Sequence, residues 1–418
     1  MTIKFSNKQE AEKNVEEVLK KDIKQLNIHV PELAQIEQEN VLDQLFNALE
    51  IITDKASWIK NIEITNKSSQ RQKFLAAIEN DESFEPDFEF REFPYNEKTF
   101  VILLDVLIGE CEKISEEVLT QHGAKEIDIE QFRAIWEETF EELKLYVKLA
   151  GNIENREKWL KFSQKIWPMA SENVVENTVS KLNEGFDIPD EEKNLTAEDL
   201  KPMWEKELER IGIDYNVEIR DVPGCFNIPE EQTVVIARGK EKERFYSRQQ
   251  AEMLTMHELF HVVRGYNGRK VCEKADLPPI FGVHTPFYDE TEEGGALYRE
   301  KATFTDQSSQ WKDYHLRFMA AYYLSEEVSF EESGEKLIEL GAEPERAFDL
   351  LARNREALRH HIYLNGYHKW KNLDETWPLL IGKIDHQLAK ILKKEVEANG
   401  MIDKPPVTGD DLFNFSFD

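Results

Sequence analysis

A short motif near the middle of the chain constrains the fold most. His257 and His261 stand four positions apart, and Glu258 follows the first histidine directly. Residues at this spacing lie about 40° apart around an α-helix, so both imidazoles would point to the same side of one helix. Such a pair can bind one Zn²⁺ through ring nitrogens, and the glutamate can then serve as general base toward a metal-bound water. The motif therefore predicts a helix that carries a zinc-hydrolase site.

Residues on both sides of the motif favour a helix. Ser247 and Gln250 form an S-x-x-Q capping box, and Gly265 stands where a helix commonly ends. The alternative for so short a motif is a buried helix with two core histidines and a solvated glutamate. A third protein ligand would favour the metal, because catalytic zinc usually has three.

Candidates for this third ligand begin another helical pattern, from Thr291 to Tyr298. Carboxylates at a helix start suit the helix dipole. The small residues Gly294 and Gly295 would let such a helix approach another one closely. Glu293 is the candidate and Glu292 the alternate, although many glutamates at helix starts are simply solvated.

The rest of the chain predicts an α+β, mostly α fold. Helical periodicity runs to about residue 212 and resumes after about residue 310. In the first part it predicts helices over residues 10–26, 31–52, 98–121 and 129–149, and in the second part over residues 310–324, 333–341, 344–363 and 374–398. Between them, residues 216–220 and 232–237 alternate as strands do, directly before the motif. We expect a zincin-like metallopeptidase core with a small antiparallel sheet and a large helical N-terminal region. An acidic stretch at 187–194 suggests the division: residues 1–190 as the helical N-terminal region, 191–398 as the catalytic domain, and 399–418 as an acidic, flexible tail.

Charge and apolar content exclude several functions. The chain has 83 acidic and 53 basic residues, a formal charge of −30, which disfavours nucleic acid and anionic membranes as partners. The longest apolar run, near residues 100–108, is interrupted by Asp105 and is too short to cross a bilayer. The first residues have no apolar core of a signal peptide, so we expect a cytoplasmic protein. The three cysteines form no C-x-x-C pair.

Several motifs in order resemble one known family. They are the histidine motif, then Arg264 and Asn267-Gly268, then residues 292–296 (EEGGA), then residues 363–366 (YLNG). This order is similar to the tyrosine carboxypeptidases that trim tubulin tails, with their prokaryotic relatives named for a QEGLA motif. The resemblance covers roughly residues 197–366 and implies one zinc ion with Glu293 as third ligand. Two departures are a histidine spacing shorter by one residue, still the ordinary step of four, and Gly295 in place of leucine.

We therefore expect a zinc-dependent peptidase, a carboxypeptidase that acts on the C-terminal residues of peptides or protein tails. Glu258 is the expected general base. Zinc and one neutral or cationic donor are expected to stabilise the oxyanion, and the candidates for this donor are Tyr363, Arg359 and His360, of which His360 is more simply explained as a structural residue. Arg264 and Asn267, from the shared motif, are expected to bind substrate. Candidates for binding the substrate carboxylate are the following arginines: Arg264, Arg299, Arg353, Arg355 and Arg359.

Alternatives remain at this point. One is a non-catalytic protein that keeps the fold for binding or regulation, and another is an endopeptidase or aminopeptidase with the same chemistry. The tubulin substrate is not carried over, because an acidic tail would be repelled by a chain with a charge of −30.

Overall fold

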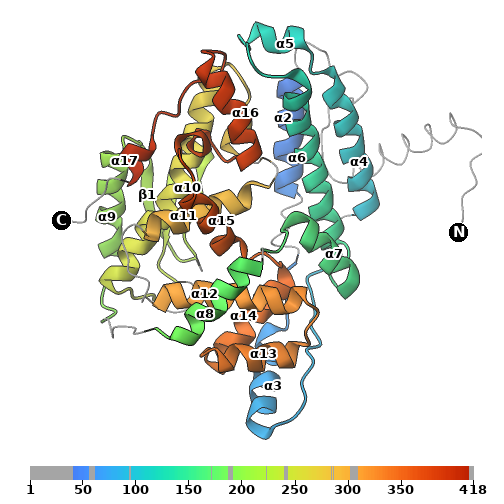
Figure 1. The fold of residues 1–418 in the computed structure, drawn as a ribbon, viewed down its shortest axis with the longest axis vertical. Coiled ribbons are helices and arrows are strands. Elements are labelled where there is room, and N and C mark those ends of the chain that lie inside the picture. The colour runs from blue at the N-terminus through green and yellow to red at the C-terminus, as the bar shows by residue number, and fades with distance from the viewer. Residues whose placement is uncertain are drawn as a thin grey trace, which may run out of the picture.

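The computed structural model describes residues 41–55, 62–93, 96–170, 172–186, 192–222, 224–239, 243–283, 285, 287–301 and 309–413. Helices dominate these residues, and one small sheet accompanies them (Figure 1). The α+β, mostly α fold predicted from sequence is confirmed. The helix expected at residues 10–26 lies outside the described residues.

The first part of the chain forms α2 (Val41–Lys55), α3 (Lys67–Asn80), α4 (Glu97–Glu110), α5 (Glu116–Gln121), α6 (Ile129–Ala150), α7 (Arg156–Ile166) and α8 (Glu172–Glu184). Asp128 begins α6 by accepting hydrogen bonds from the Glu130 and Gln131 backbone N–H groups. The apolar stripe of α6 is buried, and this helix packs against α4 and α7. Sequence predicted one helix over residues 98–121. The structure breaks it after Glu110, and a new N-cap at Ser115 starts α5.

The sheet follows α9 (Ala197–Arg210) and contains β1 (Asn216–Arg220), β2 (Phe226–Ile228) and β3 (Thr233–Ala237) in the order β1-β3-β2. β2 and β3 pair antiparallel, whereas β1 and β3 pair parallel. The sheet is therefore mixed rather than wholly antiparallel. The reason is β2, a three-residue strand that the periodicity did not predict: it reverses the chain, so that β3 runs in the direction of β1.

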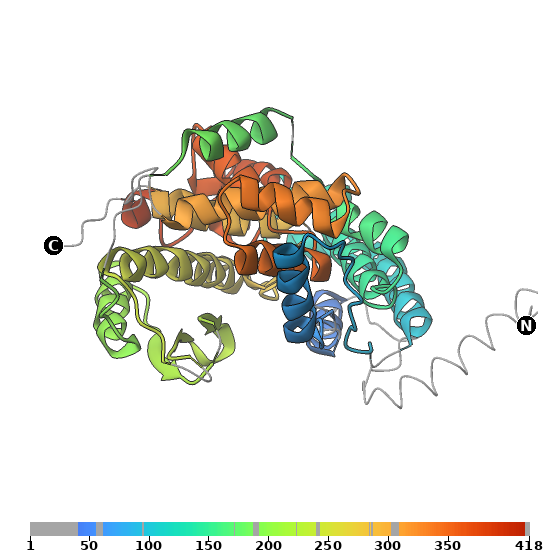
Figure 2. The same cartoon turned by 90° about the horizontal axis from the view of Figure 1, so that it is seen from below.

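The motif lies on α10 (Arg248–Lys274), which continues well beyond the end predicted at Gly265. Ser247 and Gln250 form the predicted capping box. A Cβ on Gly268 would lie 2.0 Å from the Phe281 carbonyl oxygen, so this glycine allows the helix to contact the following loop. Tertiary packing here outweighs the tendency of glycine to end a helix. Figure 2 shows the sheet on one side of α10 and the orange helices on the other.

The last part contains α11 (Tyr288–Lys301), α12 (Ser309–Ser325), α13 (Phe330–Glu339), α14 (Pro344–Glu356), α15 (Ile362–Lys371), α16 (His386–Glu397) and α17 (Gly409–Phe413). The helix predicted over residues 344–363 is two helices, because the chain becomes extended at Ala357. α11 and α15 touch backbone to backbone: a Cβ on Gly294 would lie 2.2 Å from the Gly366 carbonyl carbon.

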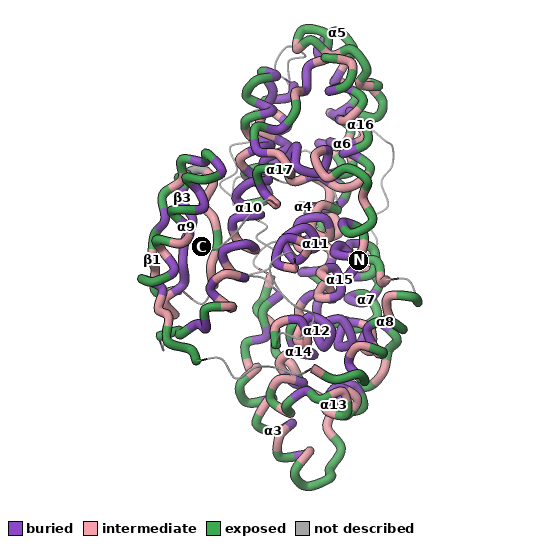
Figure 3. Tube along the Cα trace, turned by 60° about the vertical axis from the view of Figure 1, so that its left-hand side comes forward, coloured by how far each residue is buried: buried purple, intermediate pink, exposed green. Residues whose placement is uncertain are grey.

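One hydrophobic core extends from Val41 to Leu412, and α10, α11 and α15 are largely buried within it (Figure 3). In the segment predicted as a tail, Met401, Ile402 and Val407 are buried, and Val407 N–H donates to Asn267 Oδ1 at 3.1 Å. The division into domains stays a prediction. Among the described residues, no helix is long and apolar enough to cross a membrane.

Candidate metal and active site

Helices α10 and α11 bring three predicted residues together. His257, His261 and Glu293 each offer one ligand atom, and these atoms all lie within 4.8 Å of one another. Glu293 Oε2 is 3.4 Å from His257 Nε2 and 3.8 Å from His261 Nε2. Two imidazole nitrogens and one carboxylate are a donor set that zinc takes in catalytic sites.

The other nitrogen of each histidine is held by a second carboxylate. His257 Nδ1 bonds Glu300, and His261 Nδ1 bonds Glu292 Oε1 at 2.9 Å. Tyr314 steadies Glu300 by donating its hydroxyl at 3.0 Å. Carboxylate partners on Nδ1 leave Nε2 as the nitrogen for a metal and fix the ring orientation.

The charges of these residues suit a cation. Glu293 Oε2 is buried and has no hydrogen-bond partner within the described part of the chain, an arrangement that costs free energy unless an ion occupies the site. Burial alone would lower the pKa of His257, but the adjacent carboxylates of Glu293 and Glu300 raise this pKa well above its usual value. Burial raises the pKa of the Glu258 carboxyl, partly offset by both histidines. The residues present therefore fit a bound zinc ion.

These groups open into a cavity of about 480 Å³. Its lining residues come from α6, from β2 and the residue before it, from α10 and α11, from the start of α15 and the turn before it, and from the loop before α16. They are Tyr146, Cys225, Phe226, Asn227, His257, Glu258, His261, Tyr288, Asp289, Glu292, Glu293, Arg359, Tyr363 and Lys383. Tyr363 stacks on His257 with ring centroids 6.3 Å apart. Arg359 Nη1 lies 3.4 Å from Asp289 Oδ2. Two of the three candidate donors for the oxyanion, Arg359 and Tyr363, thus line the same cavity as Glu258.

Arg264 and Asn267 lie elsewhere. Both are fully buried and neither lines the cavity. Arg264 binds Glu292 at 2.7 Å and three backbone carbonyls beyond residue 378. Asn267 donates to the carbonyls of Leu380 and Val407. The structure gives both side chains internal contacts that hold the chain's C-terminal part on α10.

The other candidate arginines do not line the cavity either, except for Arg359. Arg299 is buried and forms an ion pair with Glu207. Arg355 lies between the Phe90 and Trp159 rings, on the wall of a separate hollow.

Sequence reasoning missed several residues of the site. Glu300 is the most informative, because it stands seven residues after Glu293 on α11 and therefore on the same helix face. That spacing was a usable signal. Asp289 lies four residues before Glu293 on α11, a spacing that also puts it on this face of the helix. Tyr314 and Lys383 reach the site from separate elements, and no local pattern indicates them.

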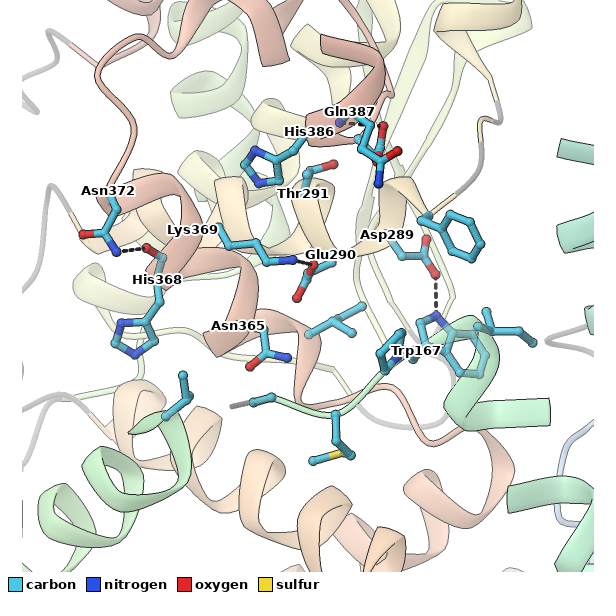
Figure 4. Close-up of a pocket in the computed structure, with 18 of the residues that line it drawn as sticks. Trp167, Asp289, Glu290, Thr291, Asn365, His368, Lys369, Asn372, His386 and Gln387 are labelled. Carbon is cyan, nitrogen blue, oxygen red and sulfur yellow. Dashed lines mark hydrogen bonds and ion pairs between the residues drawn. The ribbon is translucent and has the colours of Figure 1, made fainter. Parts of the chain in front are cut away.

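A second cavity of about 770 Å³ lies beside the start of α11 (Figure 4). Asp289 lines both cavities, and its Oδ2 accepts a hydrogen bond from Trp167 Nε1 at 3.2 Å. Carboxylates outnumber cations on its wall: Glu142, Asp289, Glu290 and Asp385 against Lys369.

Residues 72–410 match the family described as microtubule-associated tyrosine carboxypeptidase. A search among curated proteins finds no match.

Proposed function

Because the chain belongs to the family of microtubule-associated tyrosine carboxypeptidases, we propose that it is a zinc-dependent carboxypeptidase acting on the C-termini of peptides or protein tails. Family membership indicates a peptidase of the carboxypeptidase type. The observation that carries the zinc dependence is the convergence of His257, His261 and Glu293, with each histidine held from behind by a carboxylate.

His257, His261 and Glu293 would hold the ion. Zinc bound there would supply a Lewis acid that polarises the scissile carbonyl and makes water more acidic. The buried Glu293 oxygen, which has no hydrogen bond among the described residues, and the two Nδ1–carboxylate contacts support this assignment.

Glu258 is the proposed general base. Its carboxyl is half-buried on the cavity wall, and burial raises its pKa toward neutral pH. It takes a proton from the attacking water and returns one to the nitrogen of the departing residue. Arg359 and Tyr363 face the same space and are proposed to donate hydrogen bonds to the oxyanion.

The substrate backbone is proposed to lie along β2. This strand is at the edge of the sheet, and Phe226 and Asn227 line the cavity. An edge strand offers unpaired backbone groups to which an extended peptide can add.

Metal content and two substitutions test this function. We expect purified protein to contain about one zinc per chain, and Glu258→Gln to keep the zinc while losing at least about 10²-fold in kcat, the usual effect of removing a general base. Glu293→Ala should lose the zinc. Protein without stoichiometric zinc, or undiminished hydrolysis by Glu258→Gln, would exclude the proposal.

The type of peptidase is tested separately. A peptide-library digest read by mass spectrometry, with the Glu258→Gln protein as control, should show removal of C-terminal residues only. Equal cleavage of peptides with free and with amidated C-termini would exclude a carboxypeptidase.

A further inference from the structure

A carboxypeptidase has to recognise the free α-carboxylate at the end of its substrate, and this calls for a cation near the reacting groups. Among the residues that line the zinc cavity, the described chain supplies two permanent cations, Arg359 and Lys383. Of the five arginines expected from sequence to bind the substrate carboxylate, Arg359 alone lines this cavity. Lys383 was not among the expected residues.

The two cations differ in how their charge is balanced. Arg359 faces Asp289 at 3.4 Å, so a carboxylate already offsets its charge. Lys383 Nζ lies 3.5 Å from Glu292 Oε1, but the other oxygen of Glu292 is 2.7 Å from Arg264. Lys383 therefore shares its carboxylate with a second, fully buried cation. Glu292 therefore offsets the charge of Lys383 only in part.

The main chain around Lys383 is fixed. Its N–H donates to the Phe281 carbonyl at 2.7 Å, and its own carbonyl accepts from the Thr285 hydroxyl. The side chain passes over Gly265, where an added Cβ would lie 3.5 Å from Lys383 Cε. The side chain is 16% exposed. The aliphatic part of the side chain is thus largely covered, and both the backbone N–H and the carbonyl are hydrogen-bonded. Less conformational entropy is therefore lost when Nζ binds an anion.

The position relative to the metal site also suits this task. Glu292 Oε1 contacts both Lys383 Nζ and His261 Nδ1, so the ammonium lies beside a ligand histidine and not among the ligand atoms. In a substrate, the terminal carboxylate is one residue away from the scissile carbonyl, a separation of about 3.8 Å along the backbone. A cation set to the side of the metal, rather than at it, meets this requirement.

We propose that Lys383 binds the α-carboxylate of the substrate's last residue and so makes the enzyme a carboxypeptidase. This inference rests on the proposed function. Arg359 lines the same cavity as Tyr363, and Asp289 balances its charge. It therefore keeps the role proposed above, as a hydrogen-bond donor to the oxyanion.

The test compares matched peptides that have a free or an amidated C-terminus. Lys383→Met, which keeps the stem and removes the charge, should lower kcat/KM for the free acid by roughly tenfold to a hundredfold, mainly through KM. The slow cleavage of the amidated peptide should not change, so the ratio of the two rates falls. Lys383→Arg should restore part of the preference for the free acid.

Lys369→Met is the matched control, because this lysine pairs with Glu290 outside the zinc cavity. Zinc content is measured for each variant, since Lys383 also touches Glu292. If Lys383→Met loses zinc, Lys383→Gln, which keeps a donor toward Glu292 without the charge, answers the same question. An unchanged ratio in a zinc-loaded, uncharged variant overturns the assignment of Lys383. A wild-type protein with no preference for the free acid instead overturns the proposed function, and the assignment with it.

Discussion

At the scale of single residues, the site depends on contacts behind the ligands as much as on the ligands. Glu300 and Glu292 hold the two histidines at Nδ1, and Tyr314 in turn holds Glu300. Such partners set which ring nitrogen faces the metal. Zinc affinity should therefore respond to groups that never touch the ion.

Glu300→Gln tests this directly. The amide oxygen can still accept from His257 but has lost the charge that makes the bond strong, so zinc affinity should fall by about 10–100-fold. Competition with a metal chelator measures the change. Glu290→Gln, on the same helix but paired with Lys369, serves as control and should keep wild-type affinity. Equal affinities for the two variants would contradict the assigned role of Glu300.

Sequence could predict the residues whose geometry is local. Helix periodicity alone predicts that His257, Glu258 and His261 lie together, and a second motif indicates Glu293. Arg264 and Asn267 show the limit. Their motif suggested substrate contact, but the backbone carbonyls that they bind lie more than 110 residues further along the chain, at Leu379, Gly382 and Leu380. No local pattern indicates such contacts, because they depend on how distant segments pack.

At the scale of helices and strands, close packing decides where sequence patterns fail. Helix α10 continues through two glycines that usually favour an end, because a loop packs against them. β2 was missed because three residues are too few to show alternation. β1 and β3 coincide almost residue for residue with the predicted strands, since their alternation is long enough to detect.

The contact between α11 and α15 yields a prediction. Gly294→Ala would place a methyl group 2.2 Å from the Gly366 carbonyl carbon, and backbone cannot move aside as a side chain can. Separating the helices should lower the free energy of unfolding by at least about 1–3 kcal/mol. It should also weaken zinc binding, because Glu293 is part of α11. Chemical denaturation and metal titration measure the two effects.

A glycine with free space provides the control. Gly109 in α4 has nothing within 4 Å of an added Cβ, so Gly109→Ala should stabilise by about 0.5–1 kcal/mol. If Gly294→Ala were as stable as wild type and bound zinc equally well, the tight contact between α11 and α15 would not matter to the site.

At the scale of the whole molecule, hydrophobic periodicity predicted the class of fold, and ordered motifs predicted the family. Both are confirmed, by the helical architecture and by the family match over residues 72–410. Substrate preference is a property of this scale as well, because it reflects the field of all charges. The chain has an excess of acidic residues, and so does the wall of the second cavity, which is lined by four carboxylates and one lysine.

We expect this field to discriminate among substrate tails. Peptides with lysines upstream of the last residue should show kcat/KM values that fall as salt is added, whereas peptides with glutamates there should show values that rise. Steady-state kinetics between about 0.02 and 0.2 M salt, with an uncharged peptide as reference, measures both slopes. Identical salt dependence for all three peptides would show that the molecular charge does not reach the site.

The arrangement of ligands on α10 and of carboxylates on α11 has a mechanical consequence. One helix supplies both imidazoles, and the other supplies the third ligand and both groups that orient the first two. The ion would thus cross-link α10 and α11, and its affinity would depend on how the two helices are aligned along their length. A slip of α11 by one turn would break every one of these contacts together. Zinc binding should therefore be lost completely rather than gradually when the helices shift. The zinc content of the protein then reports whether α10 and α11 are correctly aligned.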